Sequence, residues 1–133
     1  MLQKIAWIFG IVLLAIGILG FVPGITSDGM LLGIFQVDAL HNVIHLLSGA
    51  LAIGAAMGAG AYARLYFQVF GVVYALVTVV GFVQVDTVLG FITVNMADNL
   101  LHVLIAAVAL YAGFAMKDNA MSAPSGMQGG MPM

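Results

Sequence analysis

Residues 5–22 read IAWIFGIVLLAIGILGFV, a run that contains no charged side chain. As a helix, a run of this length roughly spans a hydrocarbon core of about 30 Å. Lys4 precedes the run and Pro23 follows it, and the residues at its end do not resemble the cleavage site of a signal peptide. We therefore expect a retained transmembrane helix here.

Three further apolar runs follow, at about residues 40–63, 65–83 and 97–116. The whole chain is 64% hydrophobic and 6% charged, with a mean hydropathy of +1.21. Lipid leaves backbone polar groups no partner except the backbone itself, so each run is expected to be a helix. The sequence predicts an all-α membrane protein in which residues 1–116 form a four-helix transmembrane domain. Residues 117–133, rich in Met and Gly, are predicted to be a disordered cytoplasmic tail.

The few basic residues predict the orientation of these helices. Lys4, Arg64 and Lys117 all fall on one side of the four predicted spans. Short loops that carry Lys or Arg tend to remain in the cytoplasm. Four of the acidic residues fall at or near the opposite side: Asp28, Asp38, Asp86 and Asp98. We expect a multi-pass protein of the cytoplasmic (inner) membrane with both termini in the cytoplasm.

Composition also excludes several functions. The net charge is −2 with only three Lys and Arg residues, which provides no basic surface for nucleic acid. The chain has no cysteine, so disulfides, thiol chemistry, cysteine-ligated iron–sulfur clusters and c-type haem are excluded. The lipid bilayer is the expected partner. Assembly as a homo-oligomer or within a larger membrane complex is left open.

The sequence also matches itself, with one repeat at about residues 5–63 and another at about 65–116. LGIFQV at 32–37 followed by HNVIH at 41–45 recurs as LGFITV at 89–94 followed by DNLLH at 98–102. Each repeat would be a helical hairpin of the same orientation, so the two are expected to be pseudo-symmetric. The outer stretches 33–37 and 90–94 are expected to be short strands paired with each other, or short interfacial helices.

The duplication places a polar cluster at the outer end of two helices. It pairs His41 with Asp98, Asn42 with Asn99, and His45 with His102. Residues four apart share one helix face, so each pair of ligating side chains projects in one direction. If the two faces converge, three imidazoles and a carboxylate meet. Ionisable groups at membrane depth usually mark a function or a satisfied network.

This cluster has four interpretations. In the first, Asn42, Asn99 and the histidines form a structural polar network across the helices. In the second, a set of four side chains binds zinc or another divalent metal: His41, His45, Asp98 and His102. In the third, His45 and His102 are the axial ligands of haem b. The fourth is proton or cation transport by an oligomer.

Several motifs carry a resemblance to a known family. They are His41-Asn42-x-x-His45-Leu46, Ala63-Arg64-Leu65-Tyr66, Phe70-Gly71-Val72-Val73-Tyr74 and Ala97-Asp98-Asn99-x-x-His102. In this order they resemble the small four-helix prokaryotic membrane proteins catalogued as domain of unknown function 4383. The resemblance covers nearly the whole chain except the tail. It implies a four-span membrane protein and no activity, so it assigns no catalytic residue.

Taken together, the sequence favours a structural or accessory membrane subunit without catalysis. The alternative is a metal- or haem-binding subunit that uses the His/Asp cluster near the outer face.

Overall fold

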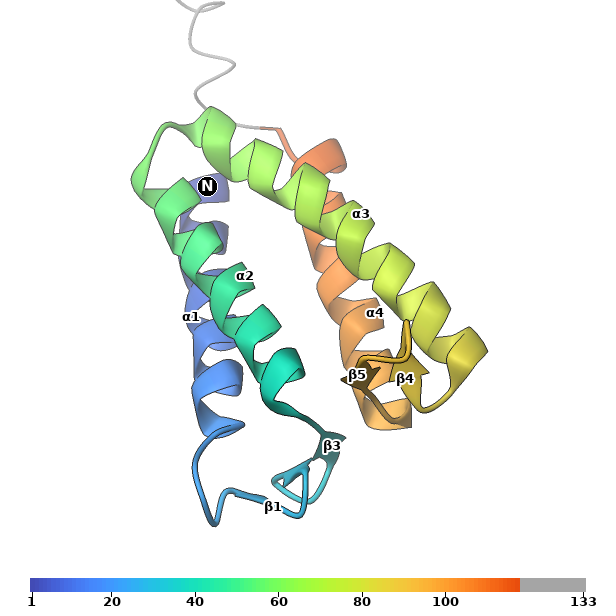
Figure 1. The fold of residues 1–133 in the computed structure, drawn as a ribbon. Helices are drawn as coiled ribbons and strands as arrows, with labels where there is room; N and C mark the ends of the chain where they lie inside the picture. Colours follow the sequence, from blue (N-terminus) through green and yellow to red (C-terminus); the bar gives the residue numbers. More distant parts are fainter. Residues whose placement is uncertain (118–133) are drawn as a thin grey trace, which may run out of the picture.

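The computed structural model describes residues 1–117, which fold into four helices long and apolar enough to cross a membrane (Figure 1). The helices are α1 (Leu2–Leu19), α2 (Ala39–Met57), α3 (Gly60–Gln84) and α4 (Met96–Leu110). A π-helical turn, η1 (Tyr111–Ala115), extends α4. The prediction of an all-α, four-span membrane protein is confirmed. Apart from Lys117, the predicted tail lies outside the described residues.

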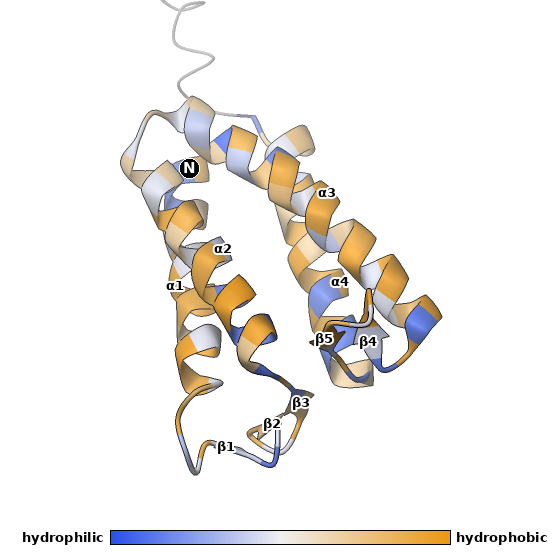
Figure 2. Cartoon of the chain, in the orientation of Figure 1, coloured by the Kyte–Doolittle hydropathy of each residue, from blue (hydrophilic) through white to orange (hydrophobic). Residues whose placement is uncertain are grey.

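The four helices consist mostly of hydrophobic residues (Figure 2), and many of their large apolar side chains are exposed, which is consistent with a lipid environment. Large aliphatic side chains such as Ile8, Leu76 and Leu104 are each at least 60% exposed. In water, surfaces of this kind would be an aggregation hazard, whereas acyl chains solvate them well. The buried core is built instead from small and aromatic side chains, among them Ala52 and Phe67.

The helices pack as two hairpins, α1 against α2 and α3 against α4 (Figure 1). Glycines allow the close approach in each hairpin. A Cβ added to Gly49 of α2 would lie 2.8 Å from the Gly10 carbonyl oxygen of α1. A Cβ added to Gly113 would lie 2.7 Å from the backbone nitrogen of Gln68 in α3. Helices in lipid associate through this kind of van der Waals fit.

The turn between α2 and α3 corrects one expectation. The sequence placed the break at Arg64, but α2 ends at Met57 and α3 begins at Gly60, so Arg64 lies on α3. Its guanidinium donates hydrogen bonds to the carbonyl oxygens of Gly113 (3.0 Å) and Met116 (2.6 Å). The last carbonyls of a helix have no partner within the helix, and a basic side chain satisfies them well. Arg64 therefore caps the end of the second hairpin.

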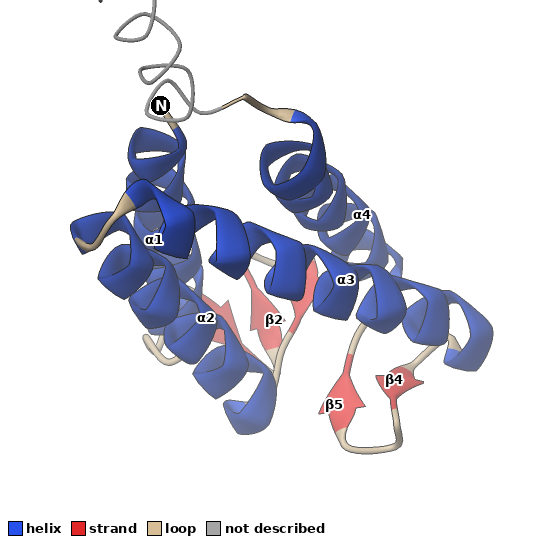
Figure 3. Ribbon diagram, turned by 90° about the horizontal axis from the view of Figure 1, so that it is seen from above, coloured by secondary structure: helices blue, strands red, loops and turns tan. Residues whose placement is uncertain are grey.

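Short strands form in both outer segments, but their pairing differs from one expected alternative. The strands are β1 (Thr26–Ser27), β2 (Met30–Leu31), β3 (Phe35–Gln36), β4 (Thr87–Val88) and β5 (Ile92–Thr93). They form two separate antiparallel sheets, β1-β2-β3 and β4-β5 (Figure 3). The expected pairing of stretch 33–37 with stretch 90–94 is therefore wrong. Tight turns with positive φ at Leu32–Gly33 and Leu89–Gly90 return each strand onto its own neighbour.

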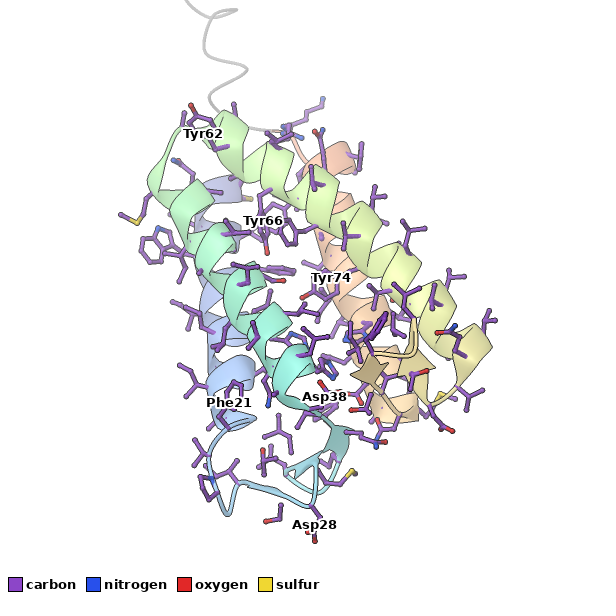
Figure 4. The ribbon with its side chains drawn as sticks, viewed as in Figure 1. Phe21, Asp28, Asp38, Tyr62, Tyr66 and Tyr74 are labelled. Carbon is purple, nitrogen blue, oxygen red and sulfur yellow. The ribbon has the colours of Figure 1, made fainter. Side chains whose placement is uncertain are left out.

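Different segments of the chain lie at the two ends of the bundle. The start of α1, the start of α3 and the end of α4 lie together at one end, and both sheets lie at the other (Figure 1). Tyr62 lies at the first end and Asp28 at the second, while Tyr66 and Tyr74 lie between the hairpins (Figure 4).

Candidate functional site

The candidate site begins with the caps of α2 and α4. Asp38 caps α2, and its Oδ1 accepts a hydrogen bond of 2.7 Å from the backbone nitrogen of His41. Asn95 caps α4 in the same way and accepts 2.9 Å from the backbone nitrogen of Asp98. Short polar side chains are preferred at this position because they satisfy free amide groups of the first turn. The caps therefore fix the positions of His41 and Asp98 in the first turns of their helices.

Hydrogen bonds between the hairpins hold the two helix starts together. Asp38 Oδ2 accepts from the backbone nitrogen (2.7 Å) and hydroxyl (2.8 Å) of Thr93 in β5. Asp98 Oδ2 accepts from the backbone nitrogen of Gln36 in β3 at 3.0 Å. Asn95 Nδ2 donates to the Ile34 carbonyl oxygen at 2.9 Å. Each outer segment is thereby bonded to the helix of the other hairpin.

Asp38 is ionised more readily than an ordinary aspartate. Burial by itself would raise the pKa of this carboxyl group, but hydrogen bonds from Thr93 and His41 outweigh it and hold the pKa below 3.8. A pKa lowered by folding means that the ionised group stabilises the folded state above the unfolded pKa. That stabilisation is lost as the pH falls through the lower folded pKa.

We expect acid to weaken the folded protein partly through Asp38. The unfolding midpoint in detergent should fall as the pH is lowered below about 5, and by less in Asp38→Asn, which has no charge to lose. Thermal unfolding monitored by circular dichroism at a series of pH values measures the difference. Equal pH dependence in the two proteins would contradict the assignment.

Three buried imidazoles lie directly below these caps. His41, His45 and His102 are 3%, 2% and 3% exposed. Their ring centroids are 4.9 Å (His41–His45), 5.6 Å (His41–His102) and 5.9 Å (His45–His102) apart. One ring nitrogen from each residue lies within 4.8 Å of those from the other two. The two helix faces predicted from the sequence thus converge at their histidines.

The hydrogen bond of His41 determines which of its ring nitrogens carries the hydrogen and which has a lone pair. Its Nδ1 lies 2.9 Å from the Thr93 carbonyl oxygen, which only accepts, so Nδ1 carries the hydrogen. In the neutral ring Nε2 then has a lone pair. Within residues 1–117, His41 Nε2, His45 Nδ1 and His102 Nδ1 are buried without a hydrogen-bond partner. The site therefore contains unsatisfied buried nitrogens from all three rings.

The remaining predicted residues are placed differently. Asp98 is buried, but its carboxylate lies outside the group of three nitrogens and accepts instead from the backbone of Asn95 and Gln36. Asn42 and Asn99 are buried as well and pack against Gly20 and Gly81, respectively. Their Oδ1 atoms have no hydrogen-bond partner among the described residues.

Two residues near the imidazoles were not identified as part of a site from the sequence. Tyr74 of α3 donates a hydrogen bond of 3.1 Å to Ser48 Oγ, and its ring centroid lies 5.9 Å from that of His102. Ser48 follows His45 by three residues and so continues the His41/His45 face of α2. The signal for Tyr74 was available, because Tyr66, Phe70, Tyr74 and Thr78 repeat every four residues along one face of α3. A polar stripe in a membrane helix faces other helices more often than lipid.

Comparison with known proteins identifies the family of the chain. Residues 3–115 match the family described as "Domain of unknown function (DUF4383)". Searches of curated proteins and of solved structures gave no match. The matched region covers the four helices except Leu2, and contains every residue of the site described above. The chain therefore belongs to the domain of unknown function 4383 family.

Proposed function

We propose that this protein is a metal-binding membrane subunit, whose ligands for a zinc-like divalent ion are His41, His45 and His102. The observation that carries the proposal is that three buried histidines each bring one ring nitrogen within 4.8 Å of those of the other two. Neutral imidazole is the common protein ligand for zinc, copper, nickel and iron.

The unsatisfied nitrogens favour this interpretation over a purely structural network. A buried polar atom without a partner destabilises the fold by about 1–3 kcal/mol. In residues 1–117, each of the three imidazoles has one such nitrogen. A structural network would be expected to satisfy these atoms with hydrogen bonds. In His41 the unpartnered atom, Nε2, is also the nitrogen with the free lone pair, because Nδ1 donates to Thr93, so a metal ion bound there relieves that destabilisation.

The distances suit a metal after a small adjustment. At zinc–nitrogen distances of about 2.0–2.1 Å, tetrahedral ligands are about 3.3 Å apart, so each nitrogen has to move by about 1 Å. Imidazole rotations provide such a shift. The hydrogen bond from His41 Nδ1 to the Thr93 carbonyl oxygen is also the usual outer contact of a metal-bound histidine, because it fixes the tautomer and the ring orientation.

Charge near the site supports the same assignment. Asp38 Oδ1 accepts a hydrogen bond of 2.7 Å from the backbone nitrogen of His41, and Asp98 precedes His102 by one turn of α4. In a low-dielectric environment a divalent cation needs nearby negative charge to offset its lost hydration. The two carboxylates provide it while their hydrogen bonds to Thr93 and Gln36 hold them in place.

The arrangement supports a metal ion better than haem b. The ring centroids of His45 and His102 are 5.9 Å apart, but the ring centroid of His41 lies only 4.9 Å and 5.6 Å from them. A porphyrin lies between its two axial ligands and extends well beyond them. The third imidazole occupies part of that space.

Metal content distinguishes these interpretations directly. Protein purified in a mild detergent should contain about one equivalent of zinc or another first-row metal by elemental analysis, and no Soret band. Dialysis against a chelator should remove the metal, and added zinc should restore it. Protein that contains no metal and takes up none would refute the proposal, and a Soret band would support the haem alternative.

We also propose that the chain arose by internal duplication. His41 and Asp98 are each the third residue of their helices, and His45 and His102 are each the seventh. Gly20 and Gly81 each contact the side chain of the asparagine at the fourth position. These matching positions support two related hairpins, of which only the first has a histidine at the third position.

We place the protein in the cytoplasmic membrane with the site near the outer face. Lys4 and Arg64 lie near the starts of α1 and α3, and Lys117 follows η1, so all three lie at the end opposite the sheets. By the positive-inside rule this end is cytoplasmic.

Cysteine labelling tests the orientation, because the natural chain has no cysteine. Ser27 in β1 and Ala59 in the α2–α3 turn are both exposed, at opposite ends. A membrane-impermeant maleimide added to intact cells should label Ser27→Cys, and should label Ala59→Cys only after the membrane is permeabilised. The reverse pattern would overturn the orientation.

A further inference from the structure

We infer that the metal proposed above keeps an open fourth coordination position, which takes a small monodentate anion from the cavity beside α3. This inference rests on the proposed metal site. Within residues 1–117, only the three histidines form a group of side chains close enough to hold an ion. Zinc prefers four ligands, and sites with three protein ligands usually bind water or a substrate at the fourth position.

A cavity of the right size adjoins all three imidazoles. Its volume is about 150 Å³, and its lining includes His41, His45, His102, Ser48, Tyr74 and Phe70. A water molecule needs about 10–15 Å³ measured in this way, so the cavity has room for a ligand of several atoms. Most of the other lining side chains are aliphatic. A ligand held there would be surrounded by apolar groups, with the metal and two hydroxyls as its polar contacts.

Ser48 and Tyr74 are placed to bind such a ligand. Ser48 follows His45 by three residues and His41 by seven, so it lies on the ligand face of α2. Ser48 Oγ accepts a hydrogen bond of 3.1 Å from the Tyr74 hydroxyl, and the hydrogen of Ser48 is then left to donate into the cavity. A donated hydrogen bond favours an anion, or the anionic form of a weak acid, on the metal.

Charge also favours an anion at this position. Three neutral imidazoles leave the two positive charges of a divalent metal unchanged. The carboxylates of Asp38 and Asp98 offset this charge only from outside the group of ligating nitrogens, so the metal itself still favours a negatively charged fourth ligand. Because no further carboxylate or thiolate joins the group of nitrogens in the described part of the chain, that anion has to come from outside the protein.

Cobalt(II) and azide provide the test. The visible spectrum of cobalt(II) reports its coordination, so purified protein is loaded with cobalt and titrated with sodium azide. We expect a saturable change in the cobalt bands. Ser48→Ala should weaken azide binding by at least about tenfold, the effect of losing one hydrogen bond to a charged group.

Thr78→Val is the matched control. Thr78 is a buried hydroxyl residue one turn beyond Tyr74, its hydroxyl donates to the Tyr74 carbonyl oxygen at 2.7 Å, and it does not line the cavity. Azide affinity should be the same in this variant as in the natural protein. Equal losses of affinity in Ser48→Ala and Thr78→Val would overturn the role given to Ser48.

The outcomes separate the two proposals. Failure to bind cobalt or zinc would refute the metal site itself. Cobalt bound with a spectrum that azide does not change would leave the metal site standing and overturn the open position. Copper-loaded protein can be used in the same way. A tyrosinate-to-copper charge-transfer band that is lost in Tyr74→Phe would show that Tyr74 fills the fourth position, and would therefore also overturn the proposal that this position is open.

Discussion

His45→Ala is expected to weaken zinc binding by more than about 100-fold, since loss of an outer-shell partner alone typically costs 10–100-fold in affinity. The substitution removes a ligand from the most buried of the three imidazoles, which is 2% exposed. His102→Ala should have a similar effect because it leaves the two remaining ligands on α2 alone. Equilibrium competition with a chromophoric chelator measures the affinity of each variant.

Two matched variants control for damage to the fold. Val43→Ala alters an exposed side chain of α2 between His41 and His45, and should bind zinc as the natural protein does. Asp98→Asn distinguishes a ligand set of three histidines from one that also includes Asp98. If the three histidines are the only protein ligands, the substitution should weaken zinc binding by no more than about 100-fold, as loss of an outer-shell residue does. A loss as large as that of His45→Ala would show that Asp98 ligates the metal.

Gly49→Ala should destabilise the folded protein by about 1–3 kcal/mol, the usual effect of overpacking a closely packed contact. A Cβ at Gly49 would lie 2.8 Å from both the Gly10 carbonyl oxygen and the Leu14 backbone nitrogen of α1. Backbone atoms cannot rotate away as a side chain does, so α1 and α2 have to separate. Unfolding by titration with sodium dodecyl sulfate, followed by circular dichroism, measures the change.

Gly54→Ala is the matched control in the same helix. A Cβ there would meet no atom of the described residues within 4 Å. Its effect should be neutral or stabilising by up to about 1 kcal/mol, because Ala favours the helix over Gly. Equal destabilisation by the two substitutions would show that the α1–α2 contact is not as close as described.

The four helices could be predicted from the sequence because hydropathy and length suffice to identify a membrane span. Their boundaries were less certain, since the chain remains apolar through the turn between α2 and α3. The sequence therefore gave Arg64 as the break, whereas Gly58 ends α2 and Arg64 caps the end of the other helix in its hairpin. A contact across 49 residues is not visible in local hydropathy.

The outer strands show the same limit. Phe35–Gln36 and Ile92–Thr93 fall within the predicted stretches, but their partners depend on turn geometry. Leu32 and Leu89 both have positive φ, which leucine rarely adopts, and each is followed by a glycine that does so readily. The composition of these segments alone did not reveal those turns.

For the candidate site, spacing predicted which histidines share a face, but not what the neighbouring carboxylates do. Asp98 matches His41 by position, which predicts a metal ligand, and its Oδ2 accepts hydrogen bonds from the backbone amides of Asn95 and Gln36. Asp38 was used only to orient the chain, although it bonds the hairpins together through Thr93. The Asn95–Asp98 capping box is local, but the bonds to Gln36 and Thr93 cross between the two hairpins, which no local pattern contains.

X-ray absorption spectroscopy of the zinc-loaded protein tests the central claim most directly. We predict zinc with three imidazole nitrogens at about 2.0–2.1 Å, identified by outer-shell scattering from the rings, and one further light-atom ligand. His45→Ala should reduce the imidazole contribution. A zinc environment of oxygen atoms without imidazole scattering would contradict a metal site formed by His41, His45 and His102.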